Sequence, residues 1–193
     1  MLTDRQIAVL FARRDSIYFS LADCDVWDAA RNALLWPGGV PCIAHPPCRL
    51  WGQLRQFSSA PAEEKDLGPW AIAQVRRWGG VVEHPASSGL WAATGCPTPA
   101  QGHDRYEGWT LGIHQYWFGH RACKPTWLYI VGCEPSATPP VPLVLGEAMH
   151  VIGRKRPYAK PEVSKREREA TPPALAHWLV EVAHQCRKEA LHG

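Results

Sequence analysis

The chain has no long apolar run and no strong net charge. The first absence argues against a membrane protein, and the second gives no support for a nucleic-acid-binding protein. No stretch of its 193 residues is apolar over enough positions to span a membrane, so we expect no membrane partner. The opening "MLTDRQIAVLFARRD" carries charges where a secretory signal peptide needs an apolar segment. The formal net charge of +3 is too weak to indicate a nucleic-acid partner by itself. We therefore expect a cytoplasmic protein whose cysteines are reduced.

The seven cysteines form no Cys-x-x-Cys pair, so the usual signature of a structural zinc site is missing. The spacings His45 to Cys48 and His120 to Cys123 are only loosely like those of metal ligands. A zinc deaminase needs a His-x-Glu and a later Pro-Cys-x-x-Cys, which are also missing. We assign no metal ligands, and a zinc-binding protein stays open as an alternative.

Short apolar runs alternate with amphipathic stretches along the chain. Buried strands are predicted at residues 6–12, 40–45, 79–85, 109–120 and 126–132, and helices at residues 25–36, 62–78 and 171–186, the last with Thr171 as its N-cap. This alternation is typical of an α/β fold with a partly parallel sheet. We expect a single domain over residues 1–193, in which residues 134–169 form an irregular, proline-rich and basic insert.

Polar clusters follow three of the predicted strands, where ligands of parallel sheets collect. They are Arg13-Arg14-Asp15, the stretch from His45 to Cys48, and Glu83-His84. Cys48 comes directly after two prolines, which would hold a nucleophilic thiol in a fixed loop. The alternative is a buried cysteine packed in a rigid turn.

Glu83 ends the apolar run "GGVV" and is expected to be half buried. Burial raises the pKa of a carboxyl group, so Glu83 would hold a proton near neutral pH. A thiol and a protonated carboxyl group suit chemistry on a pyrimidine ring. The thiol adds to ring carbon six, the acid stabilises charge at ring nitrogen three, and carbon five becomes nucleophilic.

The ordered motifs "PPC", "EHP" and "Q" with "GHR" resemble those of cytosine-C5 DNA methyltransferases. The whole pattern is similar to short phage and prophage proteins of methyltransferase-like type, over residues 40–132 and the last helix. The resemblance implies a reduced Rossmann-like, methyltransferase-type α/β sheet flanked by helices, in the cytoplasm of a bacterial host cell. It implies that Cys48 is the nucleophile, Glu83 the acid and Arg121 the catalytic arginine.

The resemblance also implies further binding residues. The substrate contacts are expected at His45, Pro47, His84, Gln115 and Lys124, and the cofactor contacts at Phe11, Arg13, Arg14 and Asp25. S-adenosylmethionine is one possible cofactor, but "LFARRDS" has no glycine turn for its close approach. Two arginines suit a phosphate better than a sulfonium, because both carry positive charge. The cofactor therefore stays open.

Residues 133–169 are too few for the target-recognition segment of this family. The expected partner is therefore DNA, single-stranded nucleic acid or a nucleotide, with a protein partner as possible help in target recognition. We predict a base-modifying enzyme with a covalent Cys48 nucleophile. Two alternatives stay open: an inactive methyltransferase-like protein that binds nucleic acid or a host protein, and the zinc-binding protein.

Overall fold

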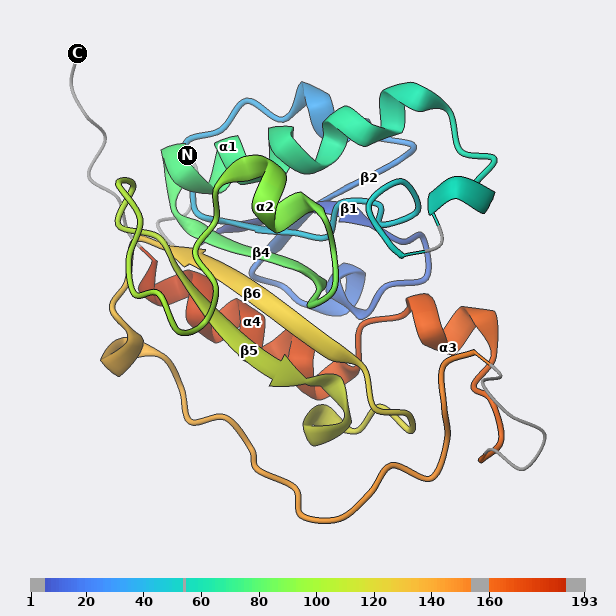
Figure 1. The fold of residues 1–193 in the computed structure, drawn as a ribbon. Coiled ribbons are helices and arrows are strands. Elements are labelled where there is room, and N and C mark those ends of the chain that lie inside the picture. Colours follow the sequence, from blue (N-terminus) through green and yellow to red (C-terminus); the bar gives the residue numbers. More distant parts are fainter. Residues whose placement is uncertain (1–5, 54, 154–159, 187–193) are drawn as a thin grey trace.

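The computed structural model describes residues 6–53, 55–153 and 160–186, and a six-stranded mixed sheet forms its centre (Figure 1). The strands are β1 (Ile7–Ala12), β2 (Cys24–Asp28), β3 (Cys42–Ala44), β4 (Gly80–Pro85), β5 (Trp109–His114) and β6 (Pro125–Val131). The α-helices are α1 (Leu67–Trp78), α2 (Leu90–Thr94), α3 (Lys165–Glu169) and α4 (Pro173–Gln185). Short 3₁₀ helices are η1 (Ile17–Ser20), η2 (Ala33–Leu35), η3 (Arg55–Phe57), η4 (Ala62–Asp66), η5 (Gln115–Phe118) and η6 (Pro135–Ala137).

The strand order is β2-β1-β3-β4-β6-β5. The first four strands of the chain are parallel to one another, whereas β6 runs antiparallel to both of its neighbours. Strand β2 pairs with one side of β1, and β3 pairs with the opposite side of β1, so the direction in which strands are added reverses at β1. In parallel α/β sheets, ligands bind beyond the strand ends at such a reversal. We call this side of the sheet, beyond the ends of β1 and β3, the carboxyl edge.

Helices cover both faces of the sheet (Figure 1). Val9 and Ile43 point to the face covered by α4 and join one core, while Ala8 and Cys42 point to the face covered by α1 and α2 and join the other. This alternation is the two-residue period of a strand buried on both sides. The α/β architecture expected from the sequence is therefore confirmed as three layers.

The predicted helix at residues 25–36 is wrong. Cys24 to Asp28 form β2, which pairs in parallel with β1 from the partners Ile7 and Cys24 onward. Pairing satisfies the backbone of this segment and buries Val26 in the core on the α4 side, so tertiary contacts override a weak helical pattern. Four of the five predicted strands are found near their expected positions. The strand predicted at residues 109–120 ends at His114, because Gln115–Phe118 form η5.

The last helix begins later than the sequence predicts. Thr171 lies outside it, and Pro172 holds the cap position with φ −56° and ψ 141°, outside the helical region. Because a residue before proline is kept out of the helical region, Pro172 cannot start the helix that Pro173 opens. The predicted apolar stripe, Leu175 to Cys186, is buried as expected.

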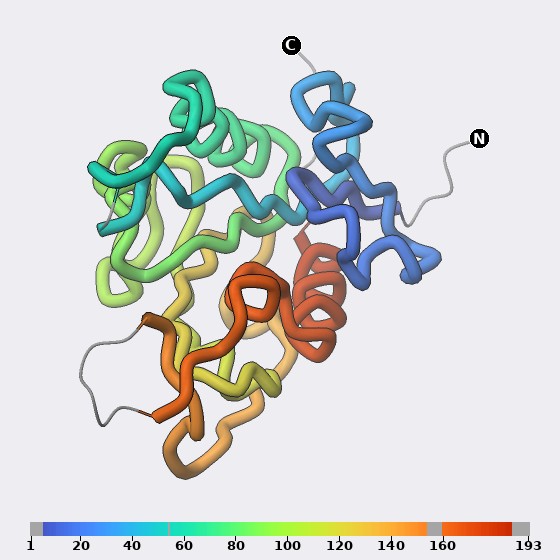
Figure 2. The backbone as a smooth tube through the Cα atoms, turned by 90° about the vertical axis from the view of Figure 1, so that its right-hand side faces the viewer, coloured from blue at the N-terminus to red at the C-terminus, as the bar shows by residue number. Residues whose placement is uncertain are grey.

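The segment between β6 and α4 loops away from the sheet and returns through α3, as the orange tube of Figure 2 shows. It contains η6 and the five-residue helix α3, which the sequence did not indicate. Ser164 caps α3 by accepting a hydrogen bond from the backbone N–H of Glu167 at 3.2 Å. Within the described ranges, no helix is both long and apolar enough to cross a membrane.

Candidate active site

The loop after β3 carries Cys48 out of the sheet. The N–H of His45 donates to the carbonyl of Leu10 at 3.0 Å, which extends the pairing of β3 with β1 by one step. Two prolines follow, and the carbonyl of Cys48 then accepts hydrogen bonds from the N–H groups of Trp51 and Gly52. Cys48 is exposed at this turn, so the alternative of a buried cysteine is wrong.

Glu83 lies near the end of β4 and joins three elements at the carboxyl edge. Its Oε2 atom accepts a hydrogen bond from Nδ1 of His45 at 3.0 Å. Its Oε1 atom accepts one from Nε2 of Gln115 at 2.9 Å, and the same Gln115 nitrogen lies 3.1 Å from Oγ1 of Thr126. The side chain of Glu83 is only 11% exposed. Both oxygens of Glu83 therefore accept hydrogen bonds in an environment that is almost fully shielded from solvent.

Tyr18, from η1, completes a chain of hydrogen bonds to this carboxylate. Its hydroxyl lies 3.1 Å from Nε2 of His45. Burial raises the pKa of Tyr18 well above its usual value, and the charge of Glu83 adds to the effect, so the phenol keeps its proton. Tyr18 then donates to Nε2, and Nδ1–H of His45 donates to Glu83, which assigns the tautomer from the network.

The predicted raised pKa of Glu83 is wrong. Burial alone would raise it, but the hydrogen bond from His45 and the positive charge of Lys124 outweigh burial and lower the pKa of Glu83 to about 2. Glu83 is thus an ionised acceptor at neutral pH and not a proton donor. The expectation failed because it counted burial and left out the donors that burial brings close.

The thiol of Cys48 lies within the electrostatic influence of both Glu83 and Lys124. Desolvation raises the pKa of Cys48, the negative charge of Glu83 raises it further, and Lys124 lowers it. The thiol is therefore protonated at neutral pH, although the residue as a whole is exposed. Lys124 is the cation that favours its thiolate.

His84 is a buried neighbour of Pro47 in the loop that carries Cys48. His84 is 1% exposed and meets the ring of Trp91 edge-on, with 5.8 Å between the ring centroids. Within the described residues, its ring nitrogens have no hydrogen bond of good geometry. Burial lowers the pKa of His84 to about 4, so its imidazole is neutral at pH 7.

Arg121 points away from this cluster. Its guanidinium makes a two-pronged ion pair with Glu167 of α3 and lies 3.1 Å from Nε2 of His150. The side chain is 56% exposed. Glu83 and Lys124 therefore act on the Cys48 thiol through their charges, whereas Arg121 is bound to α3.

The predicted cofactor residues are divided between two places. Phe11 has φ +61° at an irregular step of β1, a backbone conformation that glycine adopts most easily, and its ring meets that of Trp70 edge-on. Arg13 follows at the carboxyl edge and pairs with Asp15 and Glu169, both at 3.0 Å. Arg14, next in the chain, is exposed.

Asp25 is not at the carboxyl edge. It pairs with Ala8 near the start of β2, accepts from Nε1 of Trp27 at 2.8 Å and binds Arg31. The acidic residue at the end of β2 is Asp28, whose Oδ1 atom accepts two backbone N–H groups of the next turn. The register of β2 against β1 places Asp28, and not Asp25, at the carboxyl edge, and this register could not be predicted from the sequence.

Two residues of the cluster were missed from the sequence: Tyr18 and Thr126. Tyr18 contacts a residue 27 positions away, and no spacing pattern in the chain connects the two. Thr126 sits in β6 opposite the end of β4, where it pairs with Pro85. The signal for Thr126 was a polar residue inside an otherwise apolar strand that proves fully buried.

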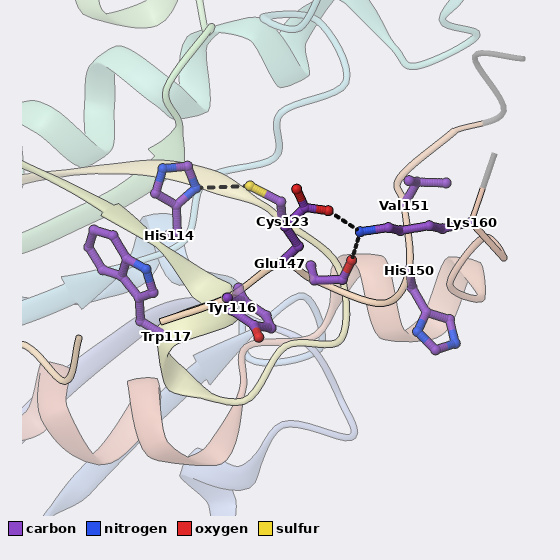
Figure 3. Close-up of a pocket in the computed structure, with 10 residues that line it drawn as sticks. His114, Tyr116, Trp117, Cys123, Glu147, His150, Val151 and Lys160 are labelled. Carbon is purple, nitrogen blue, oxygen red and sulfur yellow. Dashed lines mark hydrogen bonds and ion pairs between the residues drawn. The ribbon is translucent and has the colours of Figure 1, made fainter. Parts of the chain in front are cut away.

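A separate cavity of about 670 Å³ opens beside the connection between β5 and β6 (Figure 3). The lining residues are His114, Tyr116, Trp117, Cys123, Gly146, Glu147, Ala148, His150, Val151 and Lys160. Nδ1 of His114 lies 3.0 Å from the sulfur of Cys123, and Lys160 pairs with Glu147 at 2.8 Å. Neither Cys48 nor Glu83 is among these lining residues, so this cavity is distinct from the cluster at the carboxyl edge.

Over the part of the chain that the structure describes, no group of three or more His, Cys, Asp or Glu side chains could hold a metal ion. A scan against protein-family models found no match, and neither did searches of curated proteins and solved structures. The functional argument therefore rests on the geometry of this chain.

Proposed function

We propose that the chain modifies pyrimidine bases through covalent addition of the Cys48 thiol to ring carbon six, in the manner of cytosine-C5 methyltransferases. The observation that carries the proposal is that Glu83, in β4, and Lys124, just before β6, both act electrostatically on the Cys48 thiol, and that Gln115 forms hydrogen bonds to both of them. A nucleophile, an anionic acceptor and a cation are the groups that such an addition needs.

Each group has a role in the proposed reaction. The Cys48 thiol first gives its proton to solvent. The thiolate sulfur then forms a bond to carbon six, and the electron pair of the carbon five–carbon six double bond moves toward carbon five. Lys124 stabilises the negative charge that develops on the ring. The ionised Glu83 accepts a hydrogen bond from a ring N–H or an exocyclic amino group, while His45 and Gln115 hold it in position. Carbon five then takes up a proton or another electrophile, and the thiol is expelled when a proton leaves carbon five.

The sheet fits this proposal in its general form. We propose that it is a reduced Rossmann-like sheet, supported by four parallel strands, a reversal of strand order beside β1, and helices on both faces. Arg13 follows β1 at the carboxyl edge, where an anionic group of a cofactor or a nucleic-acid phosphate would bind. The substrate is proposed to be DNA, single-stranded nucleic acid or a nucleotide in a bacterial cytoplasm, and the group transferred is left open.

One measurement tests the proposal without a known cofactor, and a second needs a group donor. The first is release of tritium from carbon five of cytosine or uracil, in nucleotides and in single- and double-stranded DNA. The second is trapping of a 5-fluoropyrimidine oligonucleotide on Cys48 with a donor such as S-adenosylmethionine present, because fluorine cannot leave carbon five as a proton does once a group has been added there. Exchange that disappears in Cys48→Ser supports the covalent mechanism. Absence of both exchange and trapping with every substrate would rule it out.

An inactive nucleic-acid-binding protein is the second candidate. One observation favours it: both oxygens of Glu83 already accept hydrogen bonds within the protein. If His45 and Gln115 keep both oxygens of Glu83 occupied, a pyrimidine base cannot donate a hydrogen bond to this carboxylate. Binding of oligonucleotides that is unchanged in Cys48→Ser, together with absence of exchange, would support this second candidate.

A further inference from the structure

Two thiols meet at the end of the sheet opposite the candidate active site. Cys133 follows β6, and Cys186 is the C-cap of α4. Their sulfur atoms are 3.0 Å apart. A disulfide bond is about 2.05 Å long, so closure needs a movement of only about 1 Å.

The backbones on both sides hold the two sulfurs in this position. The carbonyl of Cys133 accepts a hydrogen bond from Nε1 of Trp109 at 2.8 Å. The N–H of Cys186 donates to the carbonyl of Val182 at 3.2 Å in the last turn of α4. A Cβ added at Gly79 would lie only 2.9 Å from the carbonyl oxygen of Cys186, which shows how closely this helix end packs against the start of β4. The short distance is therefore built into the core.

The two thiols differ in access and in acidity. Cys133 is half-buried, whereas Cys186 is fully buried. The hydrogen bond from Cys186 lowers the pKa of Cys133, against the opposing effects of burial and of Glu134, and the same contact raises the pKa of Cys186. An oxidant therefore meets Cys133 first, and Cys133 is also the thiol that ionises more easily.

We propose that Cys133 and Cys186 are a reversible dithiol pair that closes to a disulfide between the end of β6 and the end of α4. With a peroxide as oxidant, the Cys133 thiolate attacks one peroxide oxygen, the O–O bond breaks, and the leaving oxygen takes a proton to become water. The sulfur of Cys186 then attacks the sulfenic acid of Cys133, the S–O bond breaks, and the departing hydroxide takes the Cys186 proton as a second water. Two thiols and one hydrogen peroxide thus give one disulfide and two waters.

The disulfide would link the end of α4 to the segment after β6, at a distance from the candidate active site. Cys133 lies two residues beyond Val131, which pairs with Gly80 at the start of β4. Glu83 lies near the other end of that strand. The pair is therefore independent of the proposed chemistry at Cys48, and its test can fail or succeed separately.

The test uses the wild-type chain treated with a small excess of hydrogen peroxide or with oxidised glutathione. We expect loss of two of the seven thiols, counted with Ellman's reagent in denaturant. The melting temperature of the oxidised protein should rise by about 5 °C or more, because the bond closes a long loop. Both changes should reverse on addition of dithiothreitol.

Peptide mapping identifies the linked pair. The tryptic peptide with Cys133 also carries Cys123, because Lys124 is followed by Pro125 and trypsin does not cleave there, so the map is made in Cys123→Ser. Cys133→Ser should lose the shift in melting temperature, and Cys24→Ser, a half-buried control, should keep it. A thiol count that stays at seven, a link between other cysteines, or oxidation of Cys133 to the sulfinic acid without a link would each overturn the proposal.

Discussion

Nδ1 of His45 lies 3.0 Å from Oε2 of Glu83, and this contact joins the ends of β3 and β4. It also decides the chemical state of the carboxyl group, because a donor at this position favours the ionised form. In the proposed reaction, Glu83 therefore accepts a hydrogen bond from an N–H group of the substrate and does not act first as an acid. Any proton that reaches a ring nitrogen has to come through His45 or arrive with the base.

The first prediction concerns the reactivity of Cys48. Glu83→Gln removes a negative charge that raises the pKa of the thiol, so alkylation of Cys48 by iodoacetamide at mildly alkaline pH should become several-fold faster. Lys124→Met removes the opposing charge and should make alkylation slower. Mass spectrometry that resolves the Cys48 peptide provides the rates.

Glu181→Gln, on the exposed side of α4, is the control for this series and should leave the rate unchanged. Equal rates in all three variants would show that Cys48 lies outside the influence of Glu83 and Lys124.

The second prediction concerns Tyr18. Tyr18→Phe removes the hydroxyl that holds His45, so proton exchange at carbon five should fall by about 10- to 100-fold through misplacement of the imidazole. The free energy of unfolding should fall by only about 1 kcal/mol, the usual value of one hydrogen bond. Urea titration separates the two effects. A loss of activity that follows the loss of stability in proportion would mean that Tyr18 is only a core residue.

The third prediction concerns stability and pH. His84 has a pKa of about 4 in the folded protein and 6.5 as its ordinary value. Between these values the unfolded chain binds more protons than the folded chain, so stability is fully present above about pH 6.5 and declines as the pH falls toward 4. The loss from this group is at most about 3 kcal/mol. His84→Phe should flatten this part of the curve in urea titrations, whereas His103→Gln, at an exposed site, should not.

The fourth prediction concerns α3. Glu167 and Glu169 of this helix form ion pairs with Arg121 and Arg13. The double variant Glu167→Gln with Glu169→Gln removes both ion pairs, so a single-stranded oligonucleotide should bind more tightly, with a salt dependence steeper by about one to two phosphate contacts. Fluorescence anisotropy at several salt concentrations measures this. An unchanged slope would show that these arginines do not contact phosphate.

Much of the sheet could be predicted because its strands are short apolar runs. The pattern failed at Cys24–Asp28, where polar residues alternate with Val26 and Trp27 and only the partner strand β1 decides the structure. Helix α3 was missed because five charged residues have no apolar face. Its position depends on ion pairs with residues far away in the chain.

Positions near the ends of strands could be predicted: Glu83 lies in the last part of β4, and Cys48 lies four residues after β3. The position of Arg121 relative to Gln115 could not, because η5 and Gly119, with φ +91°, turn the chain between them. The charge state of Glu83 depends on donors from three elements, and no local pattern contains that information.

The antiparallel strand β6 has a consequence for the order of synthesis. A growing chain emerges from its N-terminus, so β1 to β4 are made well before β6. During that interval β4 is an open strand edge, able to pair with a neighbouring nascent chain. Glu83 then carries its charge without Gln115, and a charge on an open edge opposes such pairing. The carboxylate that we propose as a hydrogen-bond acceptor for the substrate thus also opposes aggregation of the nascent chain.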